Sequence, residues 1–275
     1  MTASDHMTVR LLAPEDVEAA LDLSISAGWN QTAADWKMLL RLAPGGCFGI
    51  EDGGAVRATA TLLSFGRELG WVGMVLTDPG YRRRGFARTL LEHVLRTADE
   101  RGMACLKLDA TDQGEELYRG FGFCPEQPVE RWWRHGEAGA GSPDAVAHLP
   151  AGFDKLDLEA FGVDRSELLS ALAERSRIVA VDEGFALLRD GVRAFYAGPV
   201  VARNVEAARA LVEACIRGAG VRGCFWDLLP DNRAAIELAR ELGFEPRRKL
   251  MRMARGTARR GRDELVFGIA GFELG

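Results

Sequence analysis

The sequence predicts an α/β fold that is built twice along the chain. In residues 69–135, apolar strand-like segments alternate with segments of helical periodicity, in the order strand, helix, strand, helix, strand. Residues 203–244 then repeat the residue types of residues 82–123, which indicates a second copy. The composition, 47% hydrophobic and 27% charged over 275 residues, is that of a globular protein with room for two ordinary domains.

Segments further upstream complete the first copy. Pro14 stands near the start of a helical segment and Gly28 follows its end. Thr32 is an N-cap candidate for a second helix, and Gly53-Gly54 between two β-rich runs signals a hairpin. The expected elements are a strand at 8–12, helices at 14–28 and 32–43, and strands at 47–52 and 55–65.

Glycine and proline mark the ends of the later elements as well. The apolar run 69–78 stops at Pro79-Gly80, so we expect a buried strand there. From Gly85 onward, apolar side chains recur at helical spacing until Gly102. The remaining expected elements are a strand at 104–110, a short helix at 115–123 and a strand at 129–135.

The character of the chain changes at residues 136–152. This stretch, GEAGAGSPDAVAHLPAG, is rich in Gly, Ala and Pro and shows no hydrophobic period. We therefore expect a linker here, between a first domain at residues 1–135 and a second at residues 153–275. An offset of 121 positions aligns Arg82 with Arg203, Arg101-Gly102 with Arg222-Gly223, and Gly122-Phe123 with Gly243-Phe244.

Charge and composition exclude several classes of protein. A net charge of -5 argues against non-specific binding of nucleic acid. No apolar run approaches the roughly 20 residues of a membrane span, and the N-terminus lacks the pattern of a secretory signal. The five cysteines are scattered without a CxxC pair, which disfavours a disulfide framework or structural metal and favours a reducing compartment. We expect a cytoplasmic protein with no metal and no membrane partner.

The stretch YRRRGFARTLLEHVL, residues 81–95, has the chemistry of an anion site. N–H groups at the start of a helix lack partners within it and, together with the helix dipole, favour negative charge. Gly85 lets a ligand approach the backbone, and the small side chain of Ala87 leaves the next turn of the helix accessible. Positive charge comes from Arg82, Arg83, Arg84 and Arg88. The expected ligand is a pyrophosphate, and the alternative is an exposed basic helix start.

Two segments carry a family resemblance. VLTDPGYRRRGFARTLL resembles the acetyl-CoA motif of the GCN5-related N-acetyltransferase (GNAT) superfamily, whose [Q/R]-x-x-G-x-[G/A] signature falls on Arg82, Gly85 and Ala87. ELYRGFGF, residues 116–123, resembles that family's LYxxxGF segment. The resemblance implies two tandem GNAT folds, each a mixed, mostly antiparallel sheet flanked by helices, as in bacterial tandem-GNAT proteins. It also implies acetyl-CoA as the co-substrate.

The resemblance also implies which residues bind the donor. Backbone groups of the strand before the turn would pair with the pantetheine arm, and one N–H near Val75 or Leu76 would polarise the thioester carbonyl. The pyrophosphate would lie on the N–H groups of the turn. The full expected set is Val75, Leu76, Thr77, Arg82, Arg83, Arg84, Gly85, Phe86, Ala87 and Arg88.

Proton transfer needs an acid and a base. Tyr118 matches the family's tyrosine, which protonates the leaving thiolate; the alternative is that it only packs against the helix at 85–101. The base is not clearly marked. Asp109, Glu68 and Asp112 are candidates, and each is also a reasonable solvated or capping carboxylate.

The acceptor side is expected between the first two helices. In AGWNQTAADW, residues 27–36, the side chains of Trp29, Asn30 and Trp36 offer aromatic faces and an amide to a cationic amine. The alternative is that the two tryptophans are core residues of a small domain.

The second copy departs from the motif. The offset of 121 places Glu206 on Gly85 and Ala239 on Tyr118, so the copy lacks a bare backbone for the pyrophosphate and an acid for the thiolate. We expect a degenerate GNAT-like domain whose work is structural, either walling the acceptor pocket or forming a homodimer. Tyr196 is expected to be a core residue.

The function expected from these features is acetyl-CoA-dependent N-acetylation. An acetyl group would pass to a primary amine of a small molecule by direct attack in a ternary complex. Two alternatives remain: a non-catalytic acyl-CoA-binding sensor or scaffold, and a peptide or protein N-acetyltransferase.

Overall fold

The computed structural model describes residues 8–137 and 145–275. The chain divides into two compact units, Met1–Leu106 and Lys107–Gly275. This division lies before the linker predicted at 136–152, because residues 124–134 pair with strands of the second half. Part of that linker lies outside the described residues; within the rest, Val146 forms a single bridge to Ile178.

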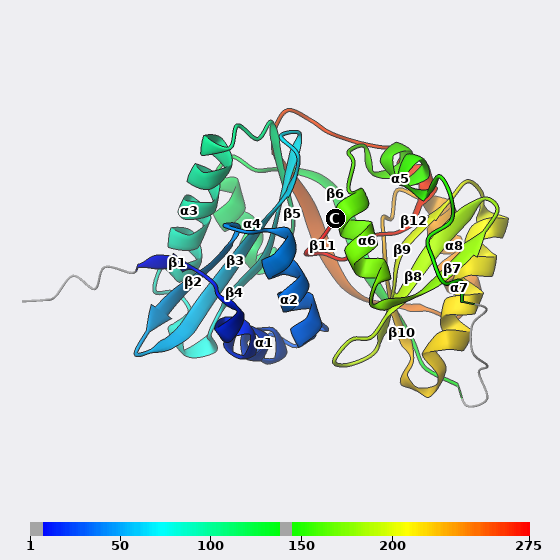
Figure 1. Ribbon diagram of the computed structural model, residues 1–275, viewed down its shortest axis with the longest axis horizontal. Helices are drawn as coiled ribbons and strands as arrows, with labels where there is room; N and C mark the ends of the chain where they lie inside the picture. Colours follow the sequence, from blue (N-terminus) through cyan, green and yellow to red (C-terminus); the bar gives the residue numbers. More distant parts are fainter. Residues whose placement is uncertain (1–7, 138–144) are drawn as a thin grey trace, which may run out of the picture. The chain divides into compact units, whose positions relative to one another are not determined.

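The first unit contains the elements expected from the sequence, with bounds that differ by a few residues (Figure 1). They are β1 (Val9–Leu11), η1 (Pro14–Asp16), α1 (Val17–Ser26), α2 (Ala33–Leu42), β2 (Cys47–Asp52), β3 (Ala55–Phe65), β4 (Leu69–Thr77), η2 (Pro79–Tyr81) and α3 (Phe86–Glu100). Strand β5 (Cys105–Ala110) crosses the division between the units.

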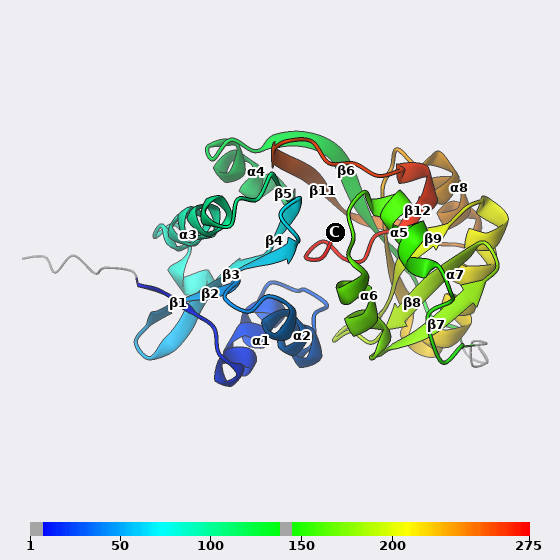
Figure 2. The ribbon, with the colours of Figure 1, turned by 45° about the horizontal axis from the view of Figure 1, so that its top comes forward.

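Strands β1 to β4 form an antiparallel meander in chain order. Helix α3 packs on β2, β3 and β4 from one face, and α1 and α2 lie on the other face (Figure 2). Because both faces are covered, β3 is buried along nearly its whole length. The Thr32 side chain caps α2, accepting from the Asp35 N–H, while Asp35 accepts from the Thr32 N–H.

The second unit repeats this order of elements. After α4 (Asp112–Arg119) and β6 (Cys124–Arg134) come α5 (Phe153–Phe161), α6 (Ser166–Ala173), β7 (Ser176–Val181), β8 (Gly184–Arg189), β9 (Phe195–Ala202), α7 (Val205–Ala219), η3 (Gly220–Arg222), β10 (Cys224–Leu228), α8 (Arg233–Glu241), β11 (Glu245–Gly256), η4 (Asp263–Leu265) and β12 (Val266–Gly268). The predicted α+β class with a mixed sheet is confirmed: β9 and β10 are parallel, whereas the pairs β7–β8, β8–β9 and β6–β11 are antiparallel.

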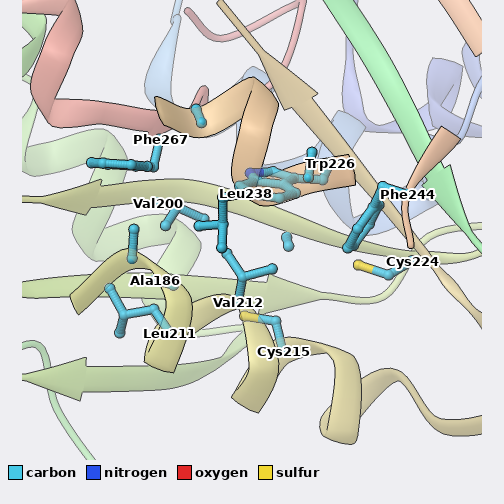
Figure 3. Close-up of a cluster of buried hydrophobic side chains, with 14 of the residues drawn as sticks. Ala186, Val200, Leu211, Val212, Cys215, Cys224, Trp226, Leu238, Phe244 and Phe267 are labelled. Carbon is cyan, nitrogen blue, oxygen red and sulfur yellow. The ribbon is translucent and has the colours of Figure 1, made fainter. Parts of the chain in front are cut away.

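Alternation along the strands gives the second unit a core on each face of its sheet. On β8, Ala186 and Leu188 join the cluster under α7 and α8, whereas Phe185 joins the cluster under α5 and α6. Figure 3 shows the first of these clusters, in which the Trp226 and Phe244 rings meet edge to face at 5.2 Å. Both faces of the sheet are therefore closed by the unit's own helices.

Helices α4 and α8 start at the predicted offset, whereas α3 and α7 do not. Helices α4 and α8 follow the N-caps Thr111 and Asn232, which keep the predicted offset of 121. That offset would start α7 at residue 207, yet α7 starts at Val205. The buried faces of the two helices keep the offset, since Phe86, Leu90 and Val94 fall on the buried Ala207, Leu211 and Cys215, so α7 only begins two residues earlier.

Candidate functional site

The strand before the glycine turn carries a β-bulge that the sequence did not reveal. On β3, Thr59 pairs with Leu76 and Thr61 pairs with Gly73, so β4 has one residue more than its partner between these pairs. Met74 in this bulge has φ 49, a left-handed conformation that is rare for a non-glycine residue. The Thr59 hydroxyl donates to the Met74 carbonyl at 2.8 Å, which satisfies a buried polar group. No glycine or asparagine marks this position in the sequence.

The bulge redirects the residues that were expected to bind the donor. Val75 and Thr77 are half-buried, and Leu76 between them is 6% exposed. A bulge bends its strand and increases the local twist. Beyond it, Leu76 and Thr77 still pair with Thr59 and Ala58 on β3. Sequence reasoning selected these three residues by resemblance, and the structure places Val75 within the bulge and Leu76 and Thr77 after it.

Eight residues connect β4 to α3. The Asp78 carboxylate accepts the Gly80 N–H at 2.9 Å and so starts the turn η2. Arg83 and Gly85 have φ 61 and φ 93, so both adopt the left-handed conformation. Gly85 is the N-cap of α3, and a residue with a Cβ would be strained there by about 1–2 kcal/mol.

The N-terminus of α3 keeps its backbone donors available. Gly85 has no side chain to cap the helix, and the first backbone hydrogen bond of the helix runs from the Thr89 N–H to the Gly85 carbonyl. The N–H groups of Gly85, Phe86 and Ala87 therefore precede the helical ladder. Phe86 contributes only its backbone here, since its side chain is 3% exposed and packs edge to face on Tyr81.

The arginines of the turn have different surroundings. Arg82 Nε lies 3.4 Å from the Thr77 carbonyl oxygen, and Arg84 lies over the Tyr81 ring at 4.8 Å and near Asp52 at 3.8 Å. Arg82, Arg83, Arg84 and Arg88 are all exposed. Four exposed guanidinium groups around an uncapped helix start give this turn a positive potential within a chain of net negative charge.

Tyr118 is a buried phenol near the end of α4. It is 9% exposed, and its ring packs edge to face on Phe123 at 6.1 Å. Burial raises the pKa of Tyr118 to about 12, because the phenolate would lose its hydration. Gly114 makes room for the ring, since a Cβ there would lie 3.0 Å from Tyr118 Cε2. The side chain is thus a neutral O–H donor throughout the physiological range.

Of the base candidates, Asp109 is fixed in an ion pair. Its side chain is fully buried, and its two oxygens accept from Arg252 Nε and Nη2 at 2.9 and 3.0 Å. Burial raises the pKa of the Asp109 carboxyl, and Arg252 acts in the opposite direction. A carboxylate held in both lone-pair directions is poorly placed to take a proton, so Asp109 is a structural group. Glu68 and Asp112 are exposed.

The expected acceptor residues differ in burial. Trp36 is 1% exposed and donates its indole N–H to Ser24 Oγ at 3.1 Å, so it belongs to the core between α1 and α2. Trp29 is half-buried and Asn30 is 6% exposed in the segment that joins these helices. Gln31, which sequence reasoning passed over, is 8% exposed, and its Oε1 has no hydrogen-bond partner among the described residues.

The corresponding turn in the second unit is much shorter. Only Arg203 and Asn204 separate β9 from α7. Asn204 is the N-cap of α7 and accepts the Ala207 N–H on its side chain at 2.8 Å. Counted from the helix start, Asn204 takes the place of Gly85, and Glu206 takes that of Ala87. Counted by the buried side chains, the offset of 121 holds along the helix and keeps Glu206 at the place of Gly85, and Ala239 keeps the place of Tyr118 in α8.

Other kinds of site are absent from the part of the chain that the structure describes. Residues 8–137 and 145–275 contain no group of three or more His, Cys, Asp or Glu side chains that could hold a metal ion. None of the helices in those ranges has the length and apolar character needed to cross a membrane. All five cysteines are free thiols, and only Cys124 is exposed.

Comparisons with protein families match each half of the chain separately. Residues 14–123 match the acetyltransferase (GNAT) family, and residues 154–268 match a second family described as an acetyltransferase (GNAT) domain. The two matches leave residues 124–153 between them, the region that contains the predicted linker.

Similar proteins cover nearly the whole chain. An uncharacterized N-acetyltransferase of Bacillus subtilis, YitH, is 28% identical over 248 residues, covering 85% of this chain and 86% of its own. A crystal structure from Pyrococcus horikoshii superimposes with a TM-score of 0.88 at 22% identity, covering 100% and 98% of the two chains. A tandem GNAT protein from the clavulanic acid biosynthesis pathway gives 0.63 at 18% identity, covering 90% and 98%.

The structural role of Asp109 can be tested through its partner. Arg252→Met should lower the free energy of unfolding by about 3–5 kcal/mol, because it leaves a buried carboxylate unpaired. Burial raises the pKa of Asp109 and Arg252 lowers it, so without Arg252 the pKa rises further and the loss should be larger at pH 7 than at pH 5. Urea unfolding at both pH values measures this.

Arg247→Met is the matched control, since Arg247 lies on the same strand in an exposed pair with Glu245. It should change stability by less than about 0.5 kcal/mol. Unchanged stability of Arg252→Met combined with a loss of amine-dependent turnover in Asp109→Asn would contradict the structural role.

Proposed function

Because the chain belongs to the GNAT superfamily and carries two GNAT domains in tandem, we propose that its first domain is an acetyl-CoA-dependent N-acetyltransferase acting on a primary amine of a small molecule. The observation that carries this proposal is the path from the bulge at Met74 through the turn to the glycine-capped start of α3. That path presents backbone donors and exposed positive charge in one continuous stretch of chain.

The donor binds along this path. Val75 within the bulge and Leu76 and Thr77 after it offer backbone groups to the amides of the pantetheine arm. The pyrophosphate lies on the N–H groups from Arg82 to Arg88, where Gly85 places no side chain between ligand and backbone. The exposed arginines add Coulomb attraction that is weakened by salt, so donor binding should fall with ionic strength.

Acetyl transfer requires one bond to form and one to break. The neutral amine nitrogen attacks the thioester carbonyl carbon, an N–C bond forms, and the C–S bond breaks as the amine proton leaves to a base or to water. An N–H near Val75 or Leu76 stabilises the oxyanion of the tetrahedral intermediate. Tyr118 donates its phenolic proton to the departing thiolate. The phenol carries its proton at neutral pH, as this role requires, and burial also makes it a weaker acid than a free tyrosine.

The acceptor is a small amine that meets the segment joining α1 and α2. Trp29 and Asn30 remain in the proposed acceptor set, and Trp36 leaves it because its indole is buried and bonded to Ser24. Gln31 Oε1 is an acceptor for an amine N–H, which supports adding this residue to the set. Two alternatives remain. With a peptide or protein acceptor, only peptides would stimulate thiol release; with a non-catalytic acyl-CoA sensor, no amine would.

The second domain is proposed to be degenerate as a catalyst. Its two-residue turn leaves no backbone to wrap a pyrophosphate, and the Asn204 side chain already takes a donor at the start of α7. Ala239 at the place of Tyr118 supplies no proton. This domain serves a structural purpose in the proposal.

Thiol release from acetyl-CoA across a panel of aminoglycosides, polyamines, amino acids and peptides tests the function. At least one small amine should raise release at least about tenfold above hydrolysis, because a bound amine competes with water at far higher effective concentration. Release stimulated only by peptides would favour the peptide reading. CoA binding without stimulation by any amine would favour the sensor.

Gly85→Glu should weaken CoA binding by at least about a hundredfold, measured by calorimetry. The substitution strains a φ of 93 and places a carboxylate against the pyrophosphate. Gly66→Glu is the matched control, because Gly66 also has a positive φ, is exposed and would meet nothing within 4 Å. Equal affinity in Gly85→Glu and Gly66→Glu would reject the placement of the pyrophosphate.

Tyr118→Phe should lower turnover by about a hundredfold and change the CoA dissociation constant by less than about twofold. Since the phenol pKa is raised to about 12, the wild-type rate should show no alkaline loss from this group below about pH 10. Tyr196→Phe, in the second domain, is the control and should leave turnover unchanged. A Tyr118→Phe enzyme with wild-type turnover would remove the residue from the mechanism.

A further inference from the structure

The C-terminal segment, residues 263–275, is built into the sheet of the second domain. Strand β12 pairs antiparallel with β9, with Val266 opposite Val201 and Gly268 opposite Val200. Directly after it, the Ile269 N–H donates to the Asp227 carbonyl of β10 at 3.0 Å. One stretch of chain is therefore hydrogen bonded to both β9 and β10.

Its position is the place where β9 and β10 separate. The two strands are paired in parallel only from Phe195 opposite Cys224 to Ala197 opposite Trp226. Beyond Ala197, β9 carries a bulge: on β8, Leu188 pairs with Ala197 and Ala186 pairs with Val200. The C-terminal segment bonds to β9 just beyond that bulge, so it fills the gap that the bulge opens.

The two bulges are equivalent. Between Gly73 and Leu76, β4 has two residues where its partner β3 has one. Between Ala197 and Val200, β9 likewise has two residues where its partner β8 has one. Val200 and Val201 thus hold the places of Leu76 and Thr77. These are the residues of the first domain that the proposed function assigns to the pantetheine arm.

Side chains of the second domain hold the C-terminal segment at several carbonyls. The Tyr196 hydroxyl donates to Ile269 at 3.0 Å, and Arg189 Nη2 donates to Ala270 at 2.6 Å. Asn232 Nδ2 donates to Val266 at 3.0 Å. At the end of the chain, Arg165 donates to the Gly275 carbonyl oxygen at 2.8 Å. Such buried, satisfied carbonyls are costly to release into a dry groove.

Packing leaves no space beside the segment. A Cβ on Gly268 would lie 2.6 Å from Trp226 Nε1, and Phe267, Ile269 and Ala270 are each at most 3% exposed. Arg165, which holds Gly275, is itself locked in a buried pair with Asp157 at 2.8 and 2.9 Å. The segment is therefore part of the core and not a strap on the surface.

We infer that the C-terminal segment is a permanent internal substitute for the acyl-CoA arm in the second GNAT domain, so that each chain binds one CoA. The inference rests on the proposed function of the first domain, because that function defines the equivalent groove. It goes further in naming what fills the second groove. The bulged strand there uses its free edge to hold the chain's own terminus.

Hydrogen exchange and calorimetry on the full chain, with and without CoA, test the inference. CoA should bind with one equivalent per chain and slow exchange in residues 75–88 at least about tenfold. Exchange in residues 197–202 and 266–275 should already be slow and should stay the same within twofold when CoA is saturating.

Tyr196→Phe provides a second measurement, since it removes one hydrogen bond to the C-terminal segment. Exchange in residues 266–275 should become about fivefold faster, while CoA still binds with one equivalent and unchanged affinity. Two equivalents of CoA in either protein, or CoA-dependent protection of residues 197–202, would overturn the inference and leave the proposed function standing. No binding of CoA would reject the proposed function and the inference together.

Discussion

A β-bulge in β4, the strand before α3, and its counterpart in β9, the strand before α7, are the constraint on which the rest of the structure depends. A strand with one extra residue cannot keep both of its neighbours in register, so backbone groups beyond the bulge need other partners. In β4 the bulge places Met74 in a left-handed conformation, and the Thr59 hydroxyl offsets part of that cost. In β9 the partner is visible: β12 pairs beyond the bulge.

The two copies differ in the connection from the bulged strand to the following helix, which determines whether the helix start has unsatisfied backbone donors. The first copy uses eight residues between strand and helix, from Asp78 to Gly85, and ends them on a glycine that leaves the helix uncapped. The second copy uses two and ends them on Asn204, whose side chain caps the helix. A capped helix start has satisfied a donor that an anion would otherwise take. Loop length and capping therefore restrict the proposed anion site to the first copy.

Sequence reasoning recovered the features that local chemistry determines. The helix that begins after Gly85 was predicted because apolar side chains recur at its spacing, and it runs from Phe86 to Glu100. It missed Met74, because nothing in the residue type marks a left-handed conformation. It also aligned Glu206 with Gly85, and the buried faces of α3 and α7 keep that offset, although α7 begins two residues earlier.

Long-range pairing was beyond sequence reasoning for a different reason. Asp109 looked like a free carboxylate at a strand end, and its partner Arg252 lies 143 residues further along the chain. Trp36 looked available to a ligand, but the Ser24 hydroxyl that accepts its N–H lies on the neighbouring helix. In both cases a polar group needed a partner, and only the tertiary fold determines which partner is within reach.

The persistence of a second GNAT copy has a physical reason in strand β6. This strand comes after the proposed catalytic tyrosine in the chain, yet it pairs with β11 along one edge and with β10 along the other. If the chain ended at the predicted linker, both edges of β6 would lose their partners, and Asp109 would lose Arg252. Residues 107–135 therefore depend on the second copy for backbone pairing and for a buried charge. A second domain that is proposed to bind no donor is still required, because its strands β10 and β11 pair with β6, which follows the segment carrying Tyr118.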